Sequence, residues 1–175
     1  MKLKELLHEI KGDLRGKASI QQFIKSYFYS ARFRLLLNHR IGKFFYKSNN
    51  YILRQVALRY KYKMLTKRNC DISYDATIGK GIRLPHPIGI VIGQGVIIED
   101  NVMIFQQVTF GSHGRNELNL AYPRIKNNAK IYAGAKIIGG ITIGENAVIG
   151  ANSLINKDVP DNSTAYGIPC KIKTS

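Results

Sequence analysis

From Ile72 onward, an aliphatic residue recurs at every sixth position of the chain. Written in sixes, the sequence gives ISYDAT, IGKGIR, an irregular LPHPIGIV, then IGQGVI, IEDNVM and IFQQVT, and, after a loop, six hexapeptides from IKNNAK to INKDVP. The fifth position is small or branched, as at Ala76, Val96 and Ala129. Such a short fixed period predicts a solenoid, in which each hexapeptide forms one parallel strand and buries its first side chain in a central column.

The N-terminal segment follows a helical pattern instead. Its apolar residues recur at spacings of three and four, as at Leu6, Leu7, Ile10 and Leu14, which predicts three or four amphipathic helices before Cys70. We therefore expect two parts. Residues 1–69 form a basic, amphipathic α-helical region, and residues 70–173 form the solenoid domain, with a loop at residues 111–124 that protrudes from the coil.

Charge separates the same two parts. The chain has 175 residues and a formal charge of +16, and residues 1–69 hold 17 Lys and Arg against 3 Asp and Glu, a balance of +14. Three interpretations of this basic, aromatic segment stay open. It is a solvated face of helices that pack on each other and on partner subunits, a peripheral contact with an anionic membrane surface, or, least favoured, a nucleic-acid surface, for which no recognised motif is present.

Several protein classes do not fit the sequence. Two cysteines a hundred positions apart predict neither a disulfide framework nor a zinc site, so we expect no metal. The charged N-terminus lacks the apolar stretch of a signal peptide, and no run of 18 apolar residues follows. These features predict a cytoplasmic protein, with association at the inner face of the membrane as the open alternative.

The six-residue period is interrupted twice. The segment Leu84–Val91 is two residues too long and contains His86, and the segment GSHGRNELNLAYPR between Phe110 and Ile125 must leave the coil. Functional residues are commonly found on loops that a rigid scaffold holds in place. We therefore expect the chemistry of this protein at these two interruptions.

Two long stretches resemble serine acetyltransferase and its relatives among the hexapeptide-repeat acyltransferases. They are DISYDATIGKGIRLPHPIGIVIGQGVIIEDNVMIFQQVTFG and YPRIKNNAKIYAGAKIIGGITIGENAVIGANSLINKDVP, followed by GIPCKI near the C-terminus. The resemblance implies a mainly β fold, the left-handed parallel β-helix with three hexapeptides to a coil. It also implies a homotrimer, with acetyl transfer from acetyl-CoA to a hydroxyl in the cleft between neighbouring subunits.

The resemblance assigns the general base to His86 and the aspartate that orients it to Asp71. The expected mechanism is direct transfer in a ternary complex, with His86 taking the hydroxyl proton. Asp71 precedes His86 by fifteen residues, nearly one coil, so we expect it roughly beneath the His86 turn. The alternative is that His86 is a structural turn residue.

Carried over by position, acetyl-CoA contacts fall on six residues, namely Gly111, Ser112, His113, Ala133, Ala151 and Lys171. The small residues would let the pantetheine arm lie along the backbone, although coil geometry alone also requires small residues. Three roles stay open for His113: a CoA contact, a second base, or a solvated loop residue without a function. His8 and His39 lie in the helical region and fit surface or packing positions.

Three positions depart from serine acetyltransferases. Ala121 and Tyr122 stand where the family carries an Arg-His pair, and Pro85 replaces an aspartate before the general base. A free amino acid would lack charged partners there. We therefore predict a carbohydrate O-acetyltransferase of capsular, exopolysaccharide or lipid-linked glycan assembly, with Tyr122 binding the sugar. The alternatives are a serine O-acetyltransferase of cysteine biosynthesis and a non-catalytic glycan- or nucleic-acid-binding β-helix.

Overall fold

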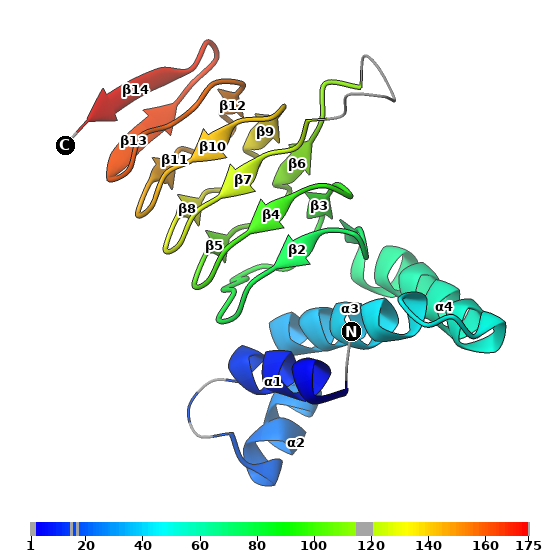
Figure 1. Cartoon of the computed structure of the whole chain (residues 1–175). Helices are drawn as coiled ribbons and strands as arrows, with labels where there is room; N and C mark the ends of the chain where they lie inside the picture. The colour runs from blue at the N-terminus through cyan, green and yellow to red at the C-terminus, as the bar shows by residue number, and fades with distance from the viewer. Residues whose placement is uncertain (1–2, 15, 17, 115–120, 175) are drawn as a thin grey trace.

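The computed structural model describes residues 3–14, 16, 18–114 and 121–174. Four helices come first, and all the strands follow them (Figure 1). The helices are α1 (Leu3–Asp13), α2 (Ile20–Tyr29), α3 (Ala31–Tyr46) and α4 (Tyr51–Arg68). The strands are β1 (Asp71–Ile72), β2 (Thr77–Ile78), β3 (Val91–Ile92), β4 (Ile97–Ile98), β5 (Met103–Ile104), β6 (Thr109–Gly111), β7 (Arg124–Ile125), β8 (Lys130–Ile131), β9 (Lys136–Ile138), β10 (Thr142–Ile143), β11 (Val148–Ile149), β12 (Leu154–Ile155), β13 (Ser163–Tyr166) and β14 (Lys171–Thr174).

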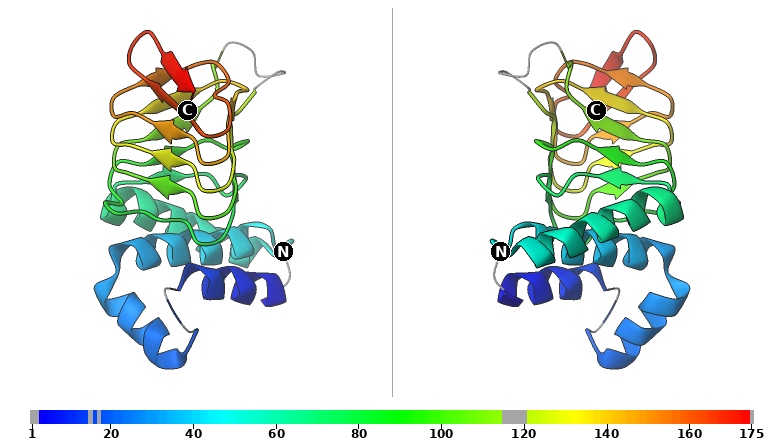
Figure 2. Two further views of the ribbon diagram at one scale, coloured as in Figure 1. Left: turned by 90° about the vertical axis from the view of Figure 1, so that its left-hand side faces the viewer. Right: turned by 90° about the vertical axis from the view of Figure 1, so that its right-hand side faces the viewer.

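The strands wind into a three-sided parallel β-helix (Figures 1 and 2). One side has the order β1-β3-β6-β9-β12, the second β10-β7-β4-β2, and the third β14-β13-β11-β8-β5, where only the β13–β14 pair is antiparallel. The first residue of each hexapeptide points inward, as Ile104, Ile131 and Ile149 show with no exposed surface. Stacked aliphatic side chains therefore form a single column, which confirms the predicted fold class.

The coil that contains His86 is longer than a regular coil. Ile72 pairs in register with Ile92, twenty residues later, whereas Ile131 pairs with Ile149, eighteen residues later. The coil that contains the loop spans 27 residues, because Ile98 pairs with Ile125. The strands on either side of both interruptions therefore stay in register, and the column is intact.

The helices cover the N-terminal end of the β-helix (Figure 2). Helix α3 packs against both α1 and α4, and α4 contacts the first strand of the β-helix. The N-caps are side chains of the preferred type, Ser19 for α2, Ser30 for α3 and Asn50 for α4. Arg40 of α3 is fully buried and donates hydrogen bonds to the carbonyls of Ile78 (2.7 Å) and Gly79 (2.6 Å). Across the described ranges, every helix is too short or too polar to cross a bilayer.

Candidate active site

His86 lies on an exposed turn at one corner of the β-helix. The turn is closed by a hydrogen bond from the Ile88 N–H to the His86 carbonyl (2.9 Å), and Gly89 adopts a positive φ of 68°. The Gly89 N–H ties the turn to the carbonyl of Asn69, the C-cap of α4 (2.7 Å), and the Ile88 carbonyl accepts from the Gln107 N–H of the next coil (2.9 Å). The two extra residues thus form a braced turn that presents the imidazole outside the column.

The longer coil offsets Asp71 from His86 along the strand direction. Because the coil has twenty residues, Asp71 pairs in register with Val91, five positions past His86. Its carboxylate is half-exposed and forms an ion pair with Lys61 of α4, whose ammonium also donates to the Ile72 carbonyl (2.9 Å). We expected Asp71 roughly beneath the His86 turn, and the residue just before it, Cys70, does contact that turn through the Pro87 carbonyl (3.4 Å). The functional pairing of Asp71 with His86 stays a prediction.

The same corner carries an aromatic column above His86. We call this corner the His86 edge; it comprises residues 84–90, 105–108, 132–135 and 150–153. The His86 ring lies 6.4 Å from that of Phe105, which stacks on Tyr132 at 5.0 Å between centroids and 16° between planes. Ala133 and Ala151 also lie on this edge, in successive coils. The Asn152 N–H, next to Ala151, donates to the Ala133 carbonyl (2.8 Å). Two of the predicted acetyl-CoA contacts thus share an edge with His86.

Three other predicted acetyl-CoA contacts lie at or next to a different corner. We call it the loop edge; it comprises residues 93–96, 112–114, 121–123 and 139–141. Gly111 ends β6 just before this edge, and Ser112 and His113 lie on it. The exposed His113 ring is against Gly139, where an added Cβ would lie 2.5 Å from His113 Nε2. The strands β1, β3, β6, β9 and β12 separate this edge from His86 within one chain.

Tyr122 also lies on the loop edge, where its ring is half-buried and packs on the coil below. A Cβ added to Gly93 would lie 2.7 Å from Tyr122 Cε1, and one added to Gly95 would overlap the other side of the ring. Two glycines therefore make room for this side chain, and one ring face covers their backbone. We predicted that a ring face and the hydroxyl of Tyr122 bind a sugar, and the structure shows that the ring packs against Gly93 and Gly95.

Lys171 belongs to the C-terminal hairpin, where it pairs with Tyr166 across β13 and β14. It is exposed, and it lies at the opposite end of the β-helix from the first coil that holds His86 (Figure 1). Its proposed contact with a CoA phosphate stays a prediction.

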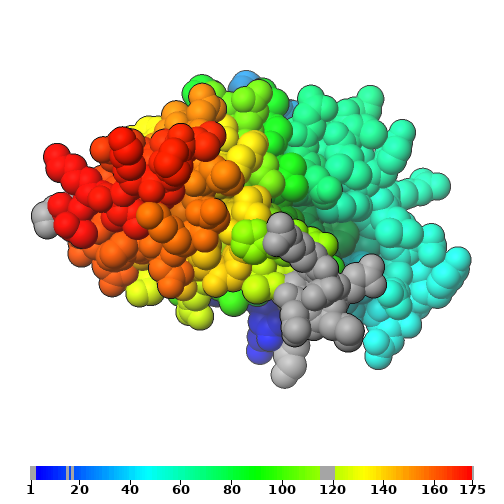
Figure 3. All heavy atoms as spheres, turned by 90° about the horizontal axis from the view of Figure 1, so that it is seen from above, coloured from blue at the N-terminus to red at the C-terminus, as the bar shows by residue number. Residues whose placement is uncertain are grey.

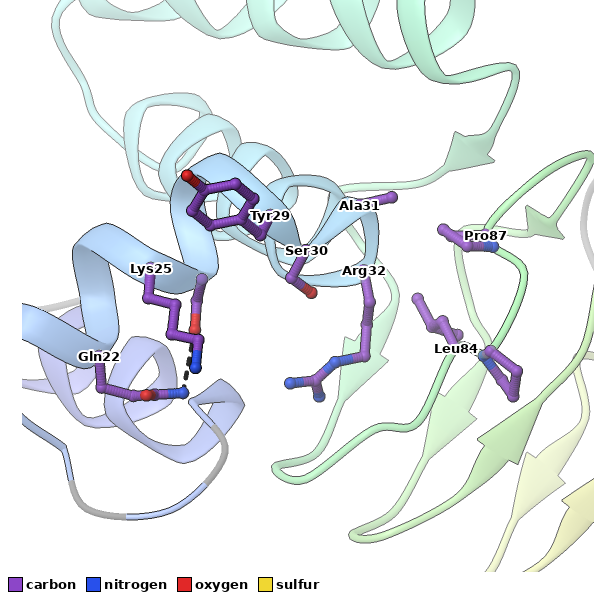
Figure 4. Close-up of a pocket in the computed structure, with 10 residues that line it drawn as sticks. Gln22, Lys25, Tyr29, Ser30, Ala31, Arg32, Leu84 and Pro87 are labelled. Atoms are coloured by element: carbon purple, nitrogen blue, oxygen red, sulfur yellow. Dashed lines mark hydrogen bonds between the residues drawn. The ribbon is translucent and has the colours of Figure 1, made fainter.

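A hollow of about 390 Å³ adjoins the helical side of the His86 turn (Figure 4). Its walls come from α2, the start of α3, and Leu84, Pro85 and Pro87. Arg32 reaches into it and donates to the carbonyls of Ile82 (2.8 Å) and Asp13 (2.7 Å). His86 is not among the lining residues, so this hollow meets the flanks of the turn and does not contain the imidazole.

Fold, repeat and exposed histidine together define a hexapeptide-repeat transferase. A family model described as bacterial transferase hexapeptide (six repeats) matches residues 122–157. The serine acetyltransferase of Buchnera aphidicola subsp. Schizaphis graminum is 34% identical over 170 residues, which cover 97% of this chain and 64% of the relative. The chain thus spans less than two thirds of the length of that curated relative.

Solved structures give the same family. A soybean serine acetyltransferase complexed with serine superposes with a TM-score of 0.83 and 31% identity, covering 97% of this chain and 70% of that one. A serine acetyltransferase in complex with CoA superposes with a TM-score of 0.81 and 29% identity, covering 98% and 71%. The chain belongs to the serine acetyltransferase family.

These relatives correct the predicted acceptor. The curated and structural relatives are serine acetyltransferases, so the prediction of a capsular, exopolysaccharide or lipid-linked glycan O-acetyltransferase is wrong. It rested on the identities of Pro85, Ala121 and Tyr122, and the structure packs the ring of Tyr122 on Gly93 and Gly95.

Sequence reasoning also missed two features of the site. Lys61, the ion-pair partner of Asp71, lies on a helix with many other cations, so nothing in the sequence distinguished it. The stacked pair of Phe105 and Tyr132 did have a signal: each follows the first residue of its hexapeptide, in IFQQVT and IYAGAK.

Proposed function

We propose that this chain transfers the acetyl group of acetyl-CoA to the hydroxyl of serine, with His86 as general base. The observation that carries the proposal is the exposed His86 on the twenty-residue coil of a chain that superposes on serine acetyltransferases bound to serine and to CoA. Its braced turn holds the imidazole on a rigid scaffold, which general-base catalysis requires.

In the proposed reaction, His86 removes the proton of the serine hydroxyl as its oxygen bonds to the thioester carbonyl carbon. Backbone N–H groups stabilise the negative charge that develops on the carbonyl oxygen. The carbon–sulfur bond then breaks, and the protonated imidazole returns its proton to the sulfur of CoA. The products are O-acetylserine and CoA, and no covalent enzyme intermediate is needed.

We further propose that the reacting unit is a homotrimer. His86, Ala133 and Ala151 lie on one edge of the first sheet, and His113 and Tyr122 lie on the other. Each side of the coil is about six residues long, up to about 20 Å when extended, so these groups cannot meet within one chain. A neighbouring copy can bring its loop edge against the His86 edge and complete a cleft that holds acetyl-CoA.

The replacements Pro85, Ala121 and Tyr122 affect how serine would bind. None of these side chains pairs with the carboxylate or the ammonium group of an amino acid, and unpaired charges in a cleft are costly. We therefore expect a high KM for serine. Loss of ground-state contacts raises KM, whereas loss of the base lowers kcat.

The test measures release of CoA thiol from acetyl-CoA with serine, and identifies O-acetylserine by mass spectrometry. His86→Ala is expected to lower kcat by about 10²- to 10⁴-fold. His8→Ala is the matched control, because His8 is exposed on α1. Serine-independent thiol release, or a His86→Ala variant with the activity of the control, would overturn the proposal.

A further inference from the structure

Helix α4 presents a second apolar stripe, about 120° around the helix from the residues by which it packs. Ala57 and Met64 are buried against α3 and the first coil. On the second stripe, Tyr51 (74% exposed), Leu58 (53%), Tyr62 (68%) and Leu65 (41%) face solvent. At 100° per residue these four side chains fall within about 60° of one another, so they form one continuous stripe along the helix. We call it the α4 stripe.

Cations flank the α4 stripe on both sides. At 100° per residue, Arg54 lies beside one margin of the stripe and Arg59 beyond the other, whereas the exposed Lys63 and Lys67 lie farther around the helix. The helix contains no Asp or Glu over its 18 residues. Figure 3, seen from above, shows the cyan-to-teal part of the chain, which includes α4, projecting beyond the β-helix, and the right-hand view of Figure 2 shows this helix lying across the end of the β-helix.

This charge selects the occupant of the stripe. Two copies of α4 placed face to face would bring their cations together in a low-dielectric contact, which is unfavourable. An anionic bilayer surface satisfies both features at once, since tyrosine and leucine enter the headgroup region and the flanking cations meet lipid phosphates. Helix α2 offers the contrast: it exposes Ile20, Ile24 and Phe28 but carries only Lys25 as a cation, so nothing there selects an anionic partner.

We propose that the α4 stripe and its flanking cations dock this protein on the surface of an anionic lipid bilayer. The helix lies in the plane of the interface and the β-helix projects away from it. The C-terminal turn of α4 adjoins the His86 turn, because Lys67 lines a hollow together with Pro87 and Ile88. The residues of the α4 stripe do not line that hollow. The proposal is independent of the proposed reaction.

The test is flotation of the full chain with vesicles of equal parts phosphatidylglycerol and phosphatidylcholine, and with vesicles of phosphatidylcholine alone. We expect binding to the anionic vesicles that weakens with salt and little binding to the neutral ones. Leu58→Gln with Tyr62→Gln removes part of the stripe, and Arg54→Gln with Arg59→Gln removes the two cations that flank it. At about fivefold for each cation, the second pair should weaken binding about 25-fold.

Matched controls use exposed residues at the other end of the molecule. Ile168→Gln is the apolar control, because Ile168 is 72% exposed, and Lys157→Gln with Lys173→Gln is the charge control. These variants should bind like the unmodified chain, and the α4 variants should keep the activity with serine. Equal binding to neutral vesicles, or equal loss in the control variants, would overturn the proposal. So would a fall in oligomer mass by light scattering in the α4 variants, because a second copy would then cover the stripe.

Discussion

Arg40 joins the helical layer to the β-helix, and its replacement by methionine provides a direct test of this junction. The side chain is fully buried and donates to Asp13 Oδ2 (3.1 Å) as well as to the carbonyls of Ile78 and Gly79. Methionine fills similar space but leaves the buried Asp13 carboxyl and two carbonyls without this donor. Removal of one partner from a buried ion pair costs about 3–5 kcal/mol. That is a large share of the about 5–15 kcal/mol by which domains are stable.

The assay is urea unfolding followed by far-UV circular dichroism, at one protein concentration because assembly changes apparent stability. Lys47→Met is the matched control, since Lys47 forms an ion pair with Asp75 (2.6 Å) in which both side chains are over 40% exposed. Such a pair contributes about 0–1 kcal/mol. If Arg40→Met and Lys47→Met lower the free energy of unfolding by the same small amount, the buried network does not hold the two parts together.

Three further changes test other contacts. His39 is buried and neither ring nitrogen has a hydrogen bond, so burial and then nearby cations lower its pKa well below the usual 6.5. The stability that neutral His39 contributes is complete above about pH 6.5 and is lost as pH falls toward the folded pKa, at up to about 1.4 kcal/mol per pH unit. His39→Leu should therefore reduce the dependence of the unfolding free energy on pH between about pH 7 and about pH 5.5. An unchanged slope would contradict this. Gly95→Ala should destabilise by about 1–3 kcal/mol through overlap with Tyr122, and the cost should shrink in a Tyr122→Ala background, as a double-mutant cycle by urea unfolding would show. If Asp71 orients the general base, Lys61→Met leaves its carboxylate unneutralised, which raises the pKa of the base and moves the acid limb of the pH profile of kcat/KM to higher pH. Lys61→Arg should restore the original profile. A profile that Lys61→Met does not move would exclude that role.

The sequence by itself determined the solenoid and the location of its interruptions. A six-residue period is a local property, because the first residue of each hexapeptide points inward wherever the strand repeats, as at Ile131 and Ile149. The same regularity made the break at His86 visible and marked the segment after Phe110 as a loop. Identity at aligned positions gave the family, whereas three unusual side chains gave a wrong acceptor.

Only the tertiary structure decided which groups meet. The register of the longer coil put Val91, and not His86, above Asp71, and Lys61 reached Asp71 from a helix that precedes it. Apolar residues at helical spacing occur on both sides of α4, and the sequence could not tell the side that packs, with Met64, from the side that stays exposed, with Tyr62. The physical reason is that periodicity fixes the direction of each side chain along its own element, while the contacts between elements depend on how distant segments are placed in space.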